Sequence, residues 1–219
     1  MFRVVSTALV FILSATLICG CSRKSTSDSG TPSAGTPADS AGSPASASVG
    51  IGDPSPEWTN LVGIDDAPHS LGDLSDAIAI AVVFTCNHCP VAVAYEDRLV
   101  QLSKNYADQP FQLVAINVNN LEEDKLPAMK ERAAEKGFDF PYLYDPSQEI
   151  GRAFGATVTP HAFLLDEGRK VVYMGAIDDN QASEKVEQHY LRDAIDAVLA
   201  GNEPTTSSTQ QFGCSIRYE

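Results

Sequence analysis

The feature that most constrains this chain is a pair of cysteines between a buried strand and a helix. Residues 79–85 (AIAVVFT) are a short, continuous apolar run, which predicts a strand buried on both faces. The next five residues, 86–90, read CNHCP. Apolar side chains then recur at helical spacing, at Val91, Tyr95, Leu99 and Leu102. The sequence therefore predicts a Cys-x-x-Cys motif at the first turn of a helix.

This placement gives the two cysteines a predicted chemistry. A thiolate at a helix N-terminus faces unsatisfied N–H groups and the positive end of the helix dipole, which lowers its pKa. We therefore predict that Cys86 is the nucleophile, and that Cys89 lies over it and resolves a mixed disulfide with a substrate. His88, if cationic, would stabilise the thiolate further. A structural cysteine pair or half of a zinc site is the alternative, but no second Cys-x-x-Cys completes a four-sulfur site.

The rest of the body alternates strand and helix signals from residue 51 to about 201, which predicts an α/β fold. A short third helix is bracketed by Asp145 as N-cap, with Gln148 in a capping box, and by Gly155 past its end. A hairpin turn at residues 166–169 carries a glycine where a positive φ is expected. The other predicted elements are a strand at 111–118, a helix between Pro127 and Gly137, strands at 162–165 and 170–174, and a helix at 183–200.

Several segments also resemble a known family. They read FTCNHCP, YEDRL, VAIN, GFDFPYLYD, GAT.TP, IDDN and FGCSI, and they run from about residue 51 to the C-terminus. In these motifs the chain is similar to the peroxiredoxin-like (AhpC/TSA) redoxin subgroup of the thioredoxin-like superfamily. The resemblance implies a central mixed β-sheet flanked by helices. It also implies a cis Thr159–Pro160 bond facing the dithiol, with the backbone of Thr159 open to an extended substrate.

The chain departs from that pattern in ways that bear on its chemistry. Thioredoxins place a buried acid six residues before the first cysteine, where this chain has Ile80, and some membrane-tethered relatives place one six residues after it, at Ala92. Proton transfer must then come from His88, His161 or water. The Pro and Thr of a peroxiredoxin motif are replaced as well. We therefore expect dithiol–disulfide exchange, with a thiol-dependent peroxidase as an alternative.

A second alternative is a metal carrier. Two thiolates and an imidazole suit Cu(I) or Zn(II), so Cys86, Cys89 and His161 are the candidate ligands of a copper or zinc delivery module. The oxidoreductase interpretation needs no cofactor. Asn119 and Asn120 follow the strand at 111–118 and are expected at the same sheet edge as the dithiol, as ligand-binding or turn residues.

Cys214 is an odd thiol near the C-terminus and needs its own explanation. It follows a polar stretch that reads as a loop, in a tail at residues 202–219. One interpretation is a third redox cysteine that exchanges with Cys86 or Cys89. The other is an inert cysteine under apolar neighbours, and the sequence leaves the two open.

The N-terminus has the pattern of a targeting signal. Residues 1–20 combine an early Arg3 with an apolar run and end at Ile18-Cys19-Gly20, before Cys21. This resembles a bacterial lipobox, which implies that Cys21 carries lipid, with an uncleaved membrane anchor as the alternative. Residues 21–50, mostly Ser, Ala, Gly, Pro and Thr, predict a disordered tether before a domain at 51–201. We expect an extracytoplasmic protein, lipid-anchored to a bacterial membrane.

The charge of the chain limits its partners. A formal net charge of −14 at pH 7 leaves no basic surface for nucleic acid. Anionic headgroups would also repel an acidic body, so the lipid at Cys21 would provide the membrane contact. The predicted partners are protein thiols and disulfides and a redox partner protein.

Overall fold

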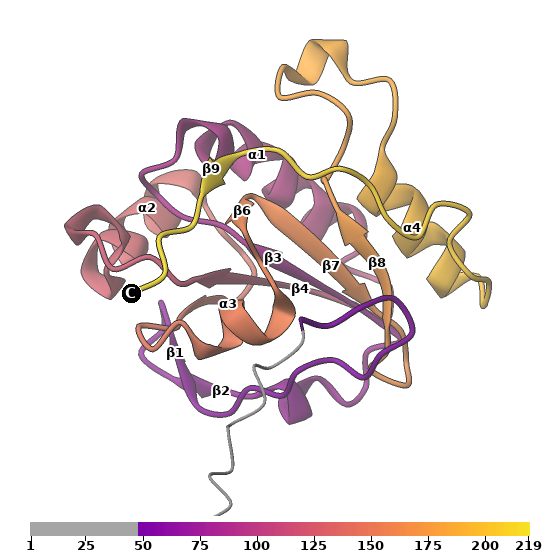
Figure 1. The fold of residues 1–219 in the computed structure, drawn as a ribbon, viewed down its shortest axis with the longest axis horizontal. Helices are drawn as coiled ribbons and strands as arrows, with labels where there is room; N and C mark the ends of the chain where they lie inside the picture. Colours follow the sequence, from indigo (N-terminus) through magenta and orange to yellow (C-terminus); the bar gives the residue numbers. More distant parts are fainter. Residues whose placement is uncertain (1–47) are drawn as a thin grey trace, which may run out of the picture. The chain divides into compact units, whose positions relative to one another are not determined.

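The computed structural model describes residues 48–219, which fold around one mixed β-sheet (Figure 1). The predicted signal segment, Cys21 and nearly all of the predicted tether lie outside these residues. The strands are β1 (Leu61–Gly63), β2 (Pro68–His69), β3 (Ala79–Phe84), β4 (Phe111–Asn117), β5 (Tyr142–Tyr144), β6 (Val158–Thr159), β7 (His161–Leu165), β8 (Val171–Gly175) and β9 (Cys214–Ser215). The α-helices are α1 (Pro90–Asn105), α2 (Leu126–Lys136), α3 (Glu149–Phe154) and α4 (Tyr190–Leu199).

The main sheet has the strand order β2-β1-β5-β4-β3-β7-β8. Strand β3 pairs in parallel with β4 and antiparallel with β7, so it is central and, as predicted, buried along its whole length. Because β3 and β4 run in parallel, the loops that follow them meet at one edge of the sheet. This edge carries the Cys-x-x-Cys motif. A separate two-stranded sheet pairs β6 with β9.

Alternate residues of the strands enter two apolar cores. One face of β3, with Ala79, Ala81 and Val83, packs with residues of α1, α2 and α4. The opposite face, with Ile80, Val82 and Phe84, packs with Phe154 of α3 and with the segment before β3. The predicted α/β fold, a mixed sheet flanked by helices, is therefore confirmed.

The boundaries of two predicted helices differ from the structure. Helix α3 begins at Glu149, and its N-cap is Gln148, with a left-handed φ of 63°, and not the predicted Asp145. The Asp145 carboxylate accepts instead from the backbone N–H of Ile150, 3.0 Å away, across the turn that precedes the helix. Helix α4 begins at Tyr190, since residues 183–185 form a separate 3₁₀ turn. Both predictions placed the N-terminus of the helix too early, because the residues that are typical of helix starts also occur in short turns.

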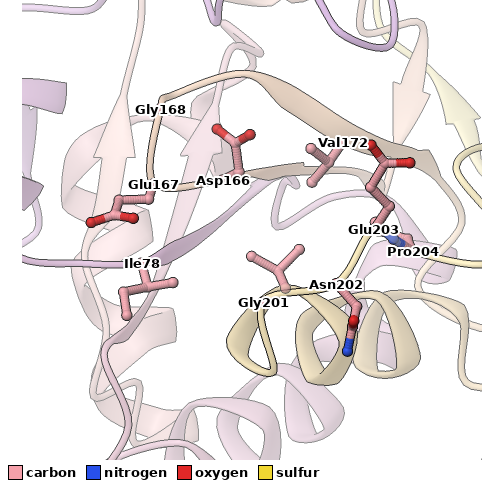
Figure 2. A pocket seen from close by; sticks show the side chains of 10 residues that line it. Ile78, Asp166, Glu167, Gly168, Val172, Gly201, Asn202, Glu203 and Pro204 are labelled. Carbon is pink, nitrogen blue, oxygen red and sulfur yellow. The ribbon is translucent and has the colours of Figure 1, made fainter.

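The β7–β8 turn also differs in detail. The residue with positive φ is Arg169, at 59°, and not the predicted glycine at 168. Its guanidinium donates to the carbonyl oxygens of Leu74 and Ala77, at 2.6 and 2.8 Å, which holds this conformation in place. Figure 2 shows the open pocket of about 380 Å³ beside this turn and the end of α4, at the far end of β3 from the cysteines. Among the described residues, no cysteine or histidine lines it.

Both ends of the described chain pack onto the fold. Val49, inside the predicted tether, is 8% exposed and lies in the core beside α3. At the other end, residues 207–209 bond to the edge of β8, where Thr209 N donates to Met174 O at 3.1 Å. Further along, Gln148 binds the backbone at Arg217 and Glu219. Between residues 48 and 219, no helix combines the length and apolarity needed to cross a membrane.

Candidate active site

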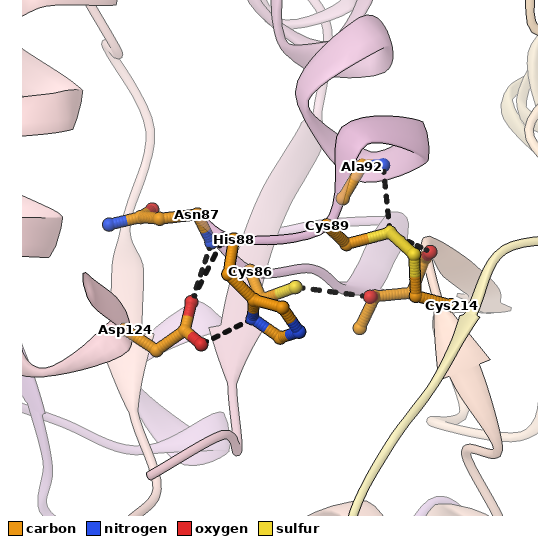
Figure 3. The surroundings of a disulfide bond; sticks show 8 residues. Cys86, Asn87, His88, Cys89, Ala92, Asp124 and Cys214 are labelled. Carbon is orange, nitrogen blue, oxygen red and sulfur yellow. Dashed lines mark hydrogen bonds and ion pairs between the residues drawn. A yellow bond between two sulfur atoms is a disulfide. The ribbon is translucent and has the colours of Figure 1, made fainter. Parts of the chain in front are cut away.

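Three cysteines meet at the sheet edge that follows β3 and β4 (Figure 3). Cys89 and Cys214 are joined in a disulfide whose Cα atoms are 5.9 Å apart, although 125 residues separate them in sequence. Cys86 lies beside them as a free, buried thiol. The structure therefore places Cys214 in contact with the predicted dithiol and pairs it with the second cysteine of that motif.

Helix α1 gives Cys89 a polar environment. Cys89 is the N-cap of this helix, and its sulfur lies 3.5 Å from the backbone N–H of Ala92, which points at it. Pro90 occupies the first helical position, where its missing N–H is no loss. The cysteine that benefits most from the helix N-terminus is therefore Cys89, whereas the sequence analysis assigned this effect to Cys86.

Cys86 lies deeper, at the end of β3, and is 2% exposed. Its sulfur is 3.1 Å from the hydroxyl oxygen of Thr159, and this hydrogen bond favours the thiolate. Burial outweighs that effect and, with the nearby Asp124 carboxylate, raises the pKa of the Cys86 thiol to about 11. The expectation of a lowered pKa at Cys86 is therefore wrong in this disulfide state, because desolvation penalises the charged form.

A buried carboxylate supports the loop between the cysteines. One oxygen of Asp124, which is 0% exposed, accepts from the backbone N–H groups of Asn87 at 2.8 Å and His88 at 3.3 Å. The other accepts from Nδ1 of His88. Asp124 thus fixes the His88 ring and leaves its Nε2 as the nitrogen that can exchange a proton. Asp124 was not among the residues predicted from the sequence, although its place after β4 puts it at this sheet edge.

The groove beside Pro160 is already filled. The Thr159–Pro160 bond is cis, as the family resemblance implied. Strand β9 pairs with β6 so that Cys214 faces Thr159, and a Cβ added to Gly213 would lie 2.1 Å from the carbonyl oxygen of Thr159. Only glycine permits this approach. The backbone of Thr159 therefore binds the chain's own tail, at the place where an extended substrate was expected.

The metal ligands proposed from the sequence do not come together. Among residues 48–219, one cluster has metal-ligating atoms within 4.8 Å of one another, and it consists of Cys86, His88 and Asp124. His161 lies on β7 opposite Phe84, where it is 1% exposed. Burial lowers the pKa of His161 to about 4. The predicted set of Cys86, Cys89 and His161 is therefore wrong, and Cys89 is also committed to a disulfide.

A cavity of about 570 Å³ opens beside the disulfide. Its lining includes Cys214 and His88 together with Asn119 and Asn120, so the two asparagines do lie at the edge that carries the cysteines. Asn119 is held by Asn117 and Asn120 by the hydroxyl of Tyr144. The remaining lining residues are Leu121, Ser215, Arg217 and Glu219.

Comparisons with known proteins agree with this fold. The family model described as Redoxin matches residues 50–190. A hypothetical protein from Sinorhizobium meliloti 1021 is 33% identical, with a TM-score of 0.74, over 79% of this chain and 97% of its own. An uncharacterized conserved protein from Geobacillus kaustophilus is 34% identical, with a TM-score of 0.73, over 78% and 93%.

A more distant structure carries a functional description. A thioredoxin family thiol:disulfide interchange protein from Chlorobium tepidum TLS is 26% identical, with a TM-score of 0.52, over 63% of this chain and 94% of its own. A search of curated proteins found no match.

Proposed function

This chain belongs to the redoxin family of thioredoxin-like proteins and is a thiol–disulfide oxidoreductase, and we propose that it works through a three-cysteine exchange. The observation that carries this proposal is the Cys89–Cys214 disulfide beside the free thiol of Cys86. A disulfide next to a third thiol in one buried cluster is the arrangement that intramolecular exchange requires. The Chlorobium interchange protein supports the same class of reaction.

The internal step exchanges one disulfide for another. The Cys86 thiolate attacks the sulfur of Cys89, the Cys86–Cys89 bond forms, and the Cys89–Cys214 bond breaks. Cys214 leaves as a thiolate and no net oxidation occurs. The three cysteines thereby hold one disulfide bond between them. It joins either Cys89 and Cys214 or Cys86 and Cys89.

His88 is the group that accepts the proton from Cys86. One of its ring nitrogens lies within 4.8 Å of the Cys86 sulfur, so the ring is the basic group beside this thiol. The Asp124 carboxylate orients the ring through Nδ1. Thr159 stabilises the resulting thiolate by donating its hydroxyl. In this proposal His88 takes a role predicted for it, whereas Thr159 acts through its hydroxyl and not, as predicted, through its backbone.

The same geometry favours exchange over the two alternative functions. A peroxidatic cysteine needs an accessible thiolate, whereas Cys86 is 2% exposed and its pKa is raised to about 11. A copper or zinc carrier would need both thiols of the dithiol free, whereas Cys89 is bonded to Cys214. Internal disulfide exchange needs no access to solvent, because the sulfur that Cys86 attacks lies in the same buried cluster and His88 takes the proton.

The exchange is tested by mapping disulfides in variants that each lack one of the three cysteines. After partial reduction and acid quenching, we expect wild-type protein to contain both Cys89–Cys214 and Cys86–Cys89. Cys86→Ser should retain only the first bond and Cys214→Ser only the second. Cys89→Ser should lose both, with thiol-driven insulin reduction lowered by about 10³-fold, because Cys89 takes part in both disulfides of the exchange. Full insulin reduction by Cys89→Ser would refute the proposal.

The protein is further proposed to act outside the cytoplasm, tethered through lipid at Cys21. The support is the lipobox-like segment that ends at Cys21 and the long Ser/Ala-rich stretch after it. A persistent disulfide also fits an oxidising compartment. We expect mass spectrometry of the mature protein to find an acylated Cys21 as its first residue. An intact Met1 in the membrane fraction would contradict this.

A further inference from the structure

The three cysteines differ sharply in access to solvent. Cys89 is 0% exposed and Cys86 is 2% exposed, whereas Cys214 is partly exposed. Of the three, only Cys214 lines the 570 Å³ cavity. An external thiol that approaches this centre therefore meets the sulfur of Cys214 first.

The tail that carries Cys214 blocks the other approach. Strand β9 pairs with β6 over Val158 and Thr159, and Ile216 N donates to Thr157 O at 2.9 Å just beyond. Ile216 is buried in the core beside α3, and the hydroxyl of Tyr218 donates to Ala156 O at 2.7 Å. While these contacts hold, no substrate strand can pair with Thr159.

The stability of the departing thiolate also favours attack on Cys214. Attack on a disulfide is faster when the departing sulfur is the better-stabilised thiolate. If Cys214 is attacked, Cys89 departs, and its charge is received by the Ala92 N–H at the N-terminus of α1. If Cys89 is attacked, Cys214 departs from an antiparallel strand, which has no such dipole. For an external thiol, which does not share the position of Cys86 beside Cys89, access and leaving-group stability therefore both select the sulfur of Cys214.

From these observations we infer that Cys214 is the cysteine that contacts external thiols, and that the cavity beside it receives them. The inference rests on the proposed function and names its substrate-facing group. An external thiolate attacks the sulfur of Cys214, a mixed disulfide forms there, and Cys89 is released as a thiolate. A second thiol then attacks the outer sulfur of the mixed disulfide. Two thiols are oxidised to one disulfide, and the Cys89–Cys214 bond is reduced.

The cavity can receive the thiol of a small molecule or of a cysteine on a protein surface. Its volume lies in the range of small-molecule sites. The side chain of Leu121, 43% exposed, forms part of its wall. His88 lies in the same wall, where its ring can take the proton of the incoming thiol. A free small thiol and a cysteine on a protein surface share this chemistry.

The test locates the mixed disulfide. Cys86→Ser protein, which cannot perform the internal exchange, is mixed with glutathione or with ubiquitin carrying one engineered surface cysteine. The reaction is quenched with acid, and the adduct is mapped by mass spectrometry. We expect the adduct on Cys214 in excess of about 10-fold over Cys89. Wild-type protein is mapped in parallel, so that the result does not depend on one variant.

A matched pair of variants tests the cavity. Leu121→Trp should slow adduct formation by about 10-fold, because the indole fills the approach to Cys214. Ile51→Trp is the control, since Ile51 is also 43% exposed but lies next to the start of β8, at the opposite end of the sheet.

The outcomes separate this inference from the proposed function. An adduct with glutathione alone identifies small thiols as the source, and one with ubiquitin alone identifies protein thiols. An adduct on Cys89, or equal rates in the two tryptophan variants, overturns the inference. Absence of the Cys86–Cys89 bond in wild-type protein would instead refute the proposed exchange, even with the adduct on Cys214.

Discussion

Replacement of Asp124 by alanine is expected to lower the free energy of unfolding by about 3 kcal/mol, because three partly buried donors lose their acceptor. The carboxylate accepts from the backbone of Asn87 and His88 and from the His88 ring, and it is fully buried. Each unsatisfied buried donor costs about 1–3 kcal/mol. Chemical denaturation monitored by tryptophan fluorescence measures the change, since Trp58 is 1% exposed in the core.

The milder variant Asp124→Asn separates the electrostatic role from the structural one. It retains an oxygen for the two backbone donors but removes the negative charge that helps to raise the pKa of Cys86. We therefore expect the pKa of the Cys86 thiol to fall in this variant. Alkylation of Cys86 as a function of pH reports it, provided that the adduct is mapped by mass spectrometry, because the exchanged disulfide would leave Cys214 as a second free thiol.

Glu123→Gln provides the control for both measurements. Glu123 neighbours Asp124 in the same 3₁₀ turn, but its side chain is exposed. Neither the unfolding free energy nor the alkylation profile should change there beyond the small effects of a surface substitution. Equal effects at the two positions would show that the charge of the turn, and not the buried carboxylate, matters.

Loss of stability on mild acidification is the second large effect, and it arises at His161. Burial lowers the folded-state pKa of His161 from 6.5 to about 4, so the unfolded chain binds this proton more tightly. The contribution of neutral His161 to the free energy of unfolding is therefore complete above pH 6.5. It is lost as the pH falls toward 4 and does not change further below pH 4. At about 1.4 kcal/mol per pKa unit, the loss across this window is about 3 kcal/mol.

The variant His161→Leu should remove that part of the pH dependence. The free energy of unfolding is measured between pH 7 and pH 4 for wild type and variant, and the difference between the two curves isolates His161 from the carboxylates that titrate in the same range. Phe163→Leu, two residues along β7 and also buried, is the control, because it removes core volume without removing a proton site. Parallel curves for wild type and His161→Leu would contradict the prediction.

Much of the fold follows from local patterns in the sequence. The apolar run of β3 and the helical spacing after residue 90 predicted a strand and a helix close to those in the structure. The end of α2 was marked by Gly137, which has a φ of 67°, a conformation that glycine adopts without steric cost. The short strands β1, β2, β5, β6 and β9 were not predicted, because two or three residues carry no readable periodicity.

The sequence by itself determined that this protein carries a Cys-x-x-Cys motif at a strand–helix junction, since the strand, the motif and the helix are contiguous in the chain. Only the tertiary structure decided the partners of these cysteines. Cys214 reaches Cys89 through the pairing of β9 with β6, and Asp124 reaches His88 because parallel strands bring their following loops to one edge. It also decided that burial raises the pKa of Cys86, because desolvation depends on what the rest of the chain places around a thiol.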